Sequence, residues 1–104
     1  MRRHAFKMQL KPGYAAEYKR RHDELFPEVA QLLHEAGIRD YSIFLDEDTH
    51  TLFAYQLVAD EVAANAIPQH PAIRRWWDYM ADIMETHADN EPIATSLREV
   101  FHQD

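Results

Sequence analysis

The chain has 104 residues, 46% of them hydrophobic and 12% aromatic, and its 18 acidic side chains outnumber its 11 basic ones to give a net charge of −7. This length suits one domain with one core, and the ordinary apolar content excludes an intrinsically disordered chain. The negative charge, with no basic cluster beyond Lys19-Arg20-Arg21, argues against binding nucleic acid through its phosphates, and no apolar run approaches the ~20 residues of a membrane-spanning helix.

The first predicted element is a strand over His4–Leu10, where polar and apolar side chains alternate. From Tyr14 to Ala36 apolar residues recur at spacings of three and four, which predicts one long helix that ends at Gly37. Pro27 interrupts this segment. It either kinks the helix, because it lacks the N–H that the Asp23 carbonyl needs, or begins a new helical segment at its first position.

A hairpin follows, with strands over Tyr41–Leu45 and Thr51–Val58 joined by an acidic turn. Asp60 is a suitable N-cap for a short helix through Ala66, and Pro71 suits the first position of a further helix. That further helix has an apolar face made of Ile73, Trp76, Trp77, Met80, Ile83 and Met84.

A polar segment then leads to a short final strand over Leu97–Phe101. The resulting order, βαββαβ, predicts an α+β fold of the ferredoxin-like type, in a single domain over residues 1–104. Four antiparallel strands would carry the helices on one face of the sheet.

The predicted hairpin is apolar on both faces. Ile43 and Leu45 lie on one face of the first strand and Phe44 on the other, and the second strand alternates Leu52 with Phe53 in the same way. Since the chain has helices for only one face, a second copy of the sheet is the simplest cover for the other. We therefore expect a homodimer.

The chain contains seven histidines and no cysteine, which excludes disulfides, thiolate zinc sites and cysteine nucleophiles. No His-x-His or His-x-x-x-His spacing occurs, so we expect no metal site. The arginines at the N-terminus are not followed by the continuous apolar run of a signal peptide, which makes a cytoplasmic location the expectation.

Tyr18 and His22 are four residues apart, and hence one above the other on the first helix, with His22 on the apolar stripe. An inward histidine beside a tyrosine hydroxyl is suited to proton transfer, because its ordinary pKa of ~6.5 is close to neutrality. A core histidine with satisfied hydrogen bonds is the alternative interpretation.

Trp76 and Trp77 point about 100° apart on their helix, so one ring can enter the core while the other reaches its margin. A tryptophan at the margin of a cavity presents a flat apolar wall, which suits the C–H face of a sugar, although plain core packing is the alternative. Tyr41 starts a strand and provides either a hydroxyl donor to a pocket or a half-exposed aromatic ring.

Several segments resemble those of L-rhamnose mutarotases. They are Glu17–His22, Pro27–Glu28, Tyr41 with Ile43–Asp46, Arg75–Met80, the opening Arg3–Phe6 with Met8–Gln9, and the ending Leu97–Phe101. Together they span nearly the whole chain at about the family's own length. A departure occurs at Leu25-Phe26, just before Pro27, where a tryptophan is usual in the family.

The resemblance implies a dimeric α/β barrel of ferredoxin-like subunits. It also implies a cytoplasmic isomerase that interconverts the α and β anomers of L-rhamnose without metal or organic cofactor. Matched position by position, it makes His22 the acid. The residues that contact the sugar would be Tyr18, Tyr41, Trp76 and Trp77.

The identity of the base stays open at this point, among water, Tyr18 and a carboxylate. Because a fold does not determine a function, two other activities stay open on the same dimeric barrel. One is a cofactor-free monooxygenase acting on an oxidisable aromatic substrate, and the other is a small-molecule-binding module without catalysis.

Overall fold

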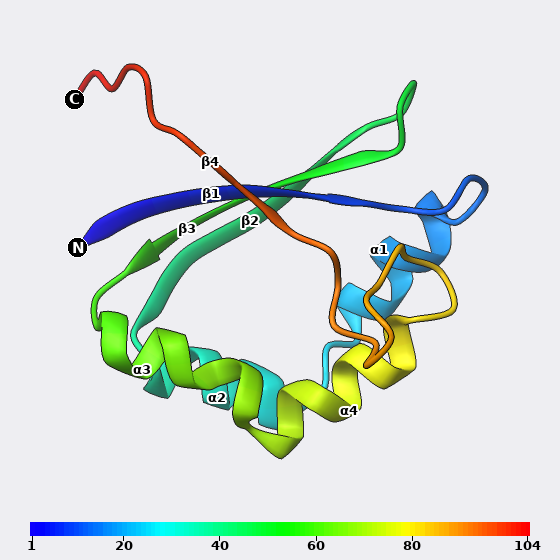
Figure 1. Ribbon diagram of the computed structural model, residues 1–104, viewed down its shortest axis with the longest axis horizontal. Helices are drawn as coiled ribbons and strands as arrows, with labels where there is room; N and C mark the ends of the chain where they lie inside the picture. The colour runs from blue at the N-terminus through cyan, green and yellow to red at the C-terminus, as the bar shows by residue number, and fades with distance from the viewer.

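A computed structural model describes residues 1–104, in which four antiparallel strands form one sheet (Figure 1). The strands are β1 (Arg2–Gln9), β2 (Ile38–Asp46), β3 (Thr51–Val58) and β4 (Thr95–Leu97). They lie in the order β2-β3-β1-β4, which is the strand order of the ferredoxin-like fold. The predicted fold class is therefore confirmed.

The helices lie along one side of this sheet (Figure 1). They are α1 (Ala15–Asp23), α2 (Pro27–Glu35), α3 (Glu61–Ala66) and α4 (Pro71–Met80), with a 3₁₀ turn over Ile67–Gln69 between the last two. The prediction of one long helix from 14 to 36 is wrong. Pro27 is the first residue of α2, where its missing N–H costs nothing, so the second of the two interpretations of this proline is correct.

Helix α4 ends at Met80, one turn earlier than the apolar pattern suggested. Ile83 and Met84 belong to the following turn, yet both are buried, and Met84 forms an isolated β-bridge with Leu10. Periodicity identified these residues as core correctly, but burial alone does not distinguish a helix from a turn that folds over the same core.

The last strand also differs from its prediction, since β4 covers Thr95–Leu97 and shares only Leu97 with the predicted range. It pairs with β1 opposite Ala5, Phe6 and Lys7, and the chain beyond it has no regular structure. Val100 and Phe101 are 80% and 77% exposed, so the apolar pattern that suggested a strand there is not buried within this chain.

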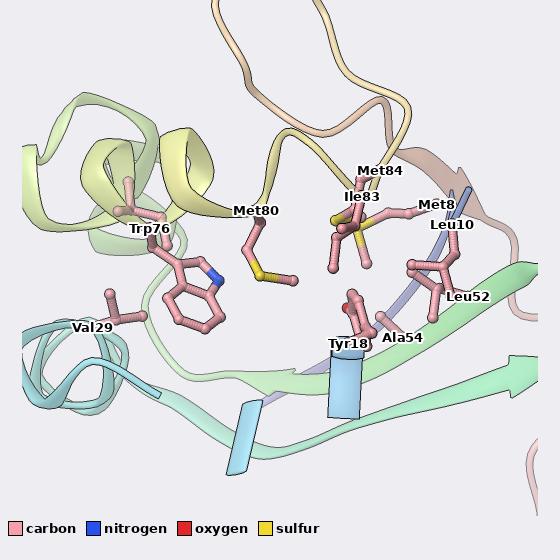
Figure 2. Close-up of a cluster of buried hydrophobic side chains, with 11 residues drawn as sticks. Met8, Leu10, Tyr18, Val29, Leu52, Ala54, Trp76, Met80, Ile83 and Met84 are labelled. Atoms are coloured by element: carbon pink, nitrogen blue, oxygen red, sulfur yellow. The ribbon is translucent and has the colours of Figure 1, made fainter. Parts of the chain in front are cut away.

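The core lies between the sheet and the helices. Figure 2 shows side chains from β1, β3, α1 and α4 converging there, with Trp76 and Met80 pointing from α4 toward the strands. The buried cluster consists of Met8, Leu10, Tyr18, Val29, Leu52, Ala54, Ile73, Trp76, Met80, Ile83 and Met84.

A β-bulge in β2 sets the face on which Tyr41 lies. Arg39 pairs with Leu57 and Ser42 with Tyr55, so two residues of β2, Asp40 and Tyr41, oppose a single residue of β3. Asp40 takes the left-handed conformation that this requires, with φ of 50°. Without the extra residue Tyr41 would oppose Tyr55 on the helix-free face, and with it Tyr41 lies on the helix side.

The other face of the sheet has no helix of its own. Phe44 and Phe53 oppose each other there on neighbouring strands and are 67% and 40% exposed. Tyr55 and Leu97 lie on the same face, on either side of Ala5 of β1. This apolar surface is the feature from which a second copy was expected.

Candidate active site

Three adjoining cavities lie between the sheet and the helices. We call the smallest the inner cavity; its volume is about 100 Å³, and it is lined by all five candidate residues, Tyr18, His22, Tyr41, Trp76 and Trp77. An α1 cavity of about 910 Å³ shares Tyr18, His22 and Tyr41 with it. A distal cavity of about 280 Å³ shares Tyr41 and Trp77 with it. The fold thus brings together the residues that the sequence singled out.

Helix α1 places Tyr18 and His22 one turn apart on its inner face. Their rings stack with centroids 4.2 Å apart, and the Trp76 ring meets His22 edge-on at 5.2 Å. Nδ1 of His22 lies 3.0 Å from the backbone carbonyl oxygen of Tyr18. A carbonyl oxygen only accepts, so Nδ1 carries a hydrogen and Nε2 is the nitrogen left for another partner.

Burial lowers the pKa of His22, and the hydrogen bond to the Tyr18 carbonyl offsets part of that shift. The ordinary pKa of histidine is ~6.5, so a histidine whose pKa is lowered from that value is neutral at pH 7. At neutral pH His22 therefore has Nδ1–H bound to the carbonyl and an unshared electron pair on Nε2. This is the form of imidazole that accepts a proton.

The two tyrosines are donors at neutral pH. Burial raises the pKa of Tyr41 to about 12 and also raises the pKa of Tyr18, so both hydroxyls keep their protons. Tyr41 belongs to the edge strand and is 38% exposed, but it lines all three cavities and its ring lies edge-on to Phe6. Neither hydroxyl is suited to removing a proton from a substrate.

The tryptophans divide as their helical spacing predicts. Trp76 is buried, with 6% of its surface exposed, and packs edge-on against Phe26 as well as His22. Trp77 is half-buried at the margin of the core, where it lines the inner and distal cavities and lies beneath the Arg74 guanidinium at 5.0 Å. An apolar wall therefore runs from the histidine toward the distal cavity.

Sequence reasoning missed Arg21, which it counted only as part of the basic cluster Lys19-Arg20-Arg21. Arg21 is buried, and its Nη1 donates to the Tyr79 backbone carbonyl and to Asp82, both at 2.8 Å, while Nε donates to Glu17 at 2.7 Å. Its guanidinium also lies 4.5 Å from the centre of the Tyr79 ring. The spacing of Glu17 and Arg21, four residues apart on a helix, was the available signal.

Sequence reasoning also missed the polar side chains of the distal cavity. His4 and Gln56 lie opposite each other on β1 and β3, and the Gln56 amide Nε2 donates to His4 Nδ1 at 3.1 Å. Nε2 of His4 lies 3.4 Å from the Ser96 hydroxyl. These contacts depend on strand register, which the sequence alone did not provide.

No group of three or more His, Asp or Glu side chains is arranged to hold a metal ion. None of the helices combines the length and the apolar character needed to cross a membrane.

Comparison with known proteins points to one family. A family model described as L-rhamnose mutarotase matches residues 3–103. The chain is similar to the L-rhamnose mutarotase of Jannaschia sp., at 56% identity over 102 residues that cover 98% of each chain. Its structure is similar to the crystal structure of an L-rhamnose mutarotase from Formosa agariphila, with a TM-score of 0.91 and 46% identity over all of both chains.

A more distant likeness shows the fold alone. A protein from Nitrosomonas europaea, provisionally described as an antibiotic biosynthesis monooxygenase, has a TM-score of 0.63 and 15% identity, over 95% of this chain and 89% of that one. This likeness carries no argument for a monooxygenase activity here.

Proposed function

Because the chain belongs to the L-rhamnose mutarotase family, we propose that it interconverts the α and β anomers of L-rhamnose, with His22 moving the proton. The observation that carries the assignment of His22 is its position. It is the one histidine in the cavity that also holds Tyr18, Tyr41 and the tryptophan pair, and its hydrogen bond at Nδ1 directs reactivity to Nε2.

Anomer exchange opens and recloses the sugar ring at C1. The anomeric hydroxyl gives its proton to Nε2 of neutral His22, and the C1–O5 bond breaks as the C1=O1 double bond forms. The ring oxygen then takes the proton from Nε2. Rotation about the C1–C2 bond, followed by the same steps in reverse, yields the other anomer.

A single nitrogen can serve both transfers, because both oxygens are bonded to the same carbon. His22 acts first as base and then as acid, so the acid role implied by family resemblance is the second step. No carboxylate lines the inner cavity, and its tyrosines hold their protons. Asp23 and Glu47 line only the α1 cavity, so no separate base is proposed for a C1 atom held in the inner cavity.

Tyr18, Tyr41, Trp76 and Trp77 are proposed to bind the sugar. The tyrosine hydroxyls donate hydrogen bonds to sugar oxygens, and the tryptophan wall covers the apolar C–H face and the methyl group that distinguishes rhamnose from a hexose with a hydroxymethyl. A homodimer, formed through the helix-free face of the sheet, is part of the same proposal.

Saturation-transfer NMR on L-rhamnose tests the activity, since it measures exchange between the two anomers directly. The protein should accelerate exchange above the uncatalysed rate. His22→Ala should reduce the accelerated rate by about 10²- to 10⁴-fold, the usual contribution of a positioned proton-transfer group. His34→Ala is the matched control, because His34 lies on α2 outside the three cavities. An undiminished rate in His22→Ala would exclude His22.

A further inference from the structure

The inner cavity, of about 100 Å³, is the smallest of the three cavities and shares lining residues with both of the others. A sugar whose C1 meets His22 can therefore extend into an adjoining cavity. Tyr41 lies on the boundary with both adjoining cavities and Tyr18 also lines the α1 cavity, whereas Trp77 lines the distal cavity and not the α1 cavity. A sugar that lies along the Trp77 ring therefore extends into the distal cavity.

Gln56 stands out in the wall of this distal cavity. On β3 it lies in the row of side chains that faces the helices, together with Leu52, Ala54 and Val58, all of which are buried and apolar. An amide in such a row loses hydration and needs partners, whereas an aliphatic side chain would pack there without that cost. Gln56 is also the residue that the bulge places opposite Tyr41.

The partners of Gln56 leave one of its atoms available. Its Nε2 donates to Nδ1 of His4, and Nε2–H of His4 in turn donates to the Ser96 hydroxyl. Neutral imidazole has one acceptor and one donor, and the hydrogen bonds to Gln56 and Ser96 use both of those on His4. The amide is therefore held in one orientation, and its Oε1 makes no hydrogen bond within the protein and is not sealed from the cavity.

We propose that Oε1 of Gln56 accepts a hydrogen bond from the O3 or O4 hydroxyl of the sugar and so selects among 6-deoxy sugars. The ring geometry supports this, because C3 and C4 are the carbons farthest from O5 and C1. With the reacting end at His22, their hydroxyls point past Tyr41 and Trp77 into the distal cavity. His4 and Ser96 act as positioning residues for the amide.

This inference rests on the proposed mutarotase function, and its test separates the two. Anomer exchange is measured for L-rhamnose, 3-deoxy-L-rhamnose and 4-deoxy-L-rhamnose, with the wild-type chain and Gln56→Leu, and each KM and kcat is determined. Gln56→Leu should raise the KM for L-rhamnose about tenfold with kcat within about twofold, as for one lost hydrogen bond. Gln31→Leu, on the surface of α2, is the matched control.

The decisive result is non-additivity. One deoxy sugar should show about a tenfold higher KM with the wild-type chain and no further increase with Gln56→Leu, because the same hydrogen bond is removed from either side. If, for both deoxy sugars, the increase in KM caused by the missing hydroxyl multiplied with the increase caused by Gln56→Leu, the proposal would be overturned. Wild-type KM values equal for all three sugars, a result that needs no variant, would also overturn it. A wild-type chain inactive on L-rhamnose would instead refute the proposed function itself.

Discussion

Nδ1 of His22 donates a hydrogen bond to the backbone carbonyl of Tyr18, one helical turn earlier and 3.0 Å away. This contact determines which nitrogen of the imidazole is available for chemistry. Because the same helix stacks the Tyr18 ring on the imidazole, the orientation of the histidine is fixed by its own helix rather than by a carboxylate. The site therefore needs no aspartate or glutamate to hold its histidine.

The pH dependence of the rate follows from this arrangement. Neutral His22 is the form that takes the anomeric proton, and burial lowers its pKa below the ordinary ~6.5. We expect kcat, after subtraction of the uncatalysed rate, to be constant around pH 7 and to fall as the pH drops through the lowered pKa. Saturation-transfer NMR across this range measures the profile. A catalysed rate that rises on acidification would mean that the imidazolium, rather than the neutral ring, starts the reaction.

Substitutions of the two tryptophans should have different effects, one mainly on the stability of the fold and the other mainly on sugar binding. Trp76→Ala empties a buried site and should cost about 3–5 kcal/mol of the free energy of unfolding. Trp77 is half-buried and lies between two cavities, so Trp77→Ala should act mainly by raising the KM for L-rhamnose. Urea unfolding of both variants measures the change in the free energy of unfolding, and anomer-exchange kinetics measure the change in KM. Equal KM values for Trp77→Ala and the wild-type chain would remove Trp77 from the sugar site.

The local parts of this structure could be predicted from the sequence. Alternation in β1 and β3, the position of Pro71 at the start of α4, and the inward face of α1 depend on residues close together in the chain. The spacing of Tyr18 and His22 is of the same kind, and so is the division of the tryptophans between core and margin.

What the sequence did not reveal depends on contacts between distant segments. The bulge at Asp40 shifts the register of β2, and only this shift explains why Ile38 and Tyr41, three residues apart, lie on one side of the sheet. The pairing of His4 with Gln56 likewise requires the register of β1 with β3. The burial of Arg21 requires knowing where α4 ends.

Arg21 should stabilise the fold by joining α1 to the end of α4. It binds Glu17 on its own helix, the Tyr79 carbonyl in the last turn of α4, and Asp82 just after α4. We expect Arg21→Met to lower the free energy of unfolding by about 2–3 kcal/mol, since several hydrogen bonds to a charged group are lost together. Arg20 is a neighbouring arginine whose own side chain is exposed and pairs with Glu17 and Glu24, so Arg20→Met should change the free energy of unfolding by less than about 1 kcal/mol. If urea unfolding showed equal losses of stability for Arg21→Met and Arg20→Met, the stabilising role assigned to Arg21 would be contradicted.

The same cluster predicts a loss of stability in acid. The guanidinium groups of Arg20 and Arg21 lower the pKa of Glu17 to about 2, and Arg21 lowers the pKa of Asp82. A carboxyl group with a lowered pKa in the folded state stabilises the fold above its unfolded pKa, and this contribution disappears as the pH falls through the folded value. For Glu17 the loss should extend from about pH 4.5 to about pH 2. Thermal unfolding should show a smaller pH dependence in Glu17→Gln over this range; an unchanged dependence would contradict the role of this carboxylate.

The helix-free face of the sheet should hold two copies together. Phe53 lies near its centre on β3, opposite Phe44, and both rings are exposed in a single chain of 12.3 kDa. Light scattering at micromolar concentration should give about twice this mass for the wild-type chain and the single mass for Phe53→Asp, because two buried carboxylates would face a closely packed apolar surface. Val62→Asp is the control, since Val62 is 81% exposed on α3, on the helix side of the sheet, and should leave the dimer intact. A monomeric wild-type chain would contradict the proposal and leave the exposed phenylalanines without a cover.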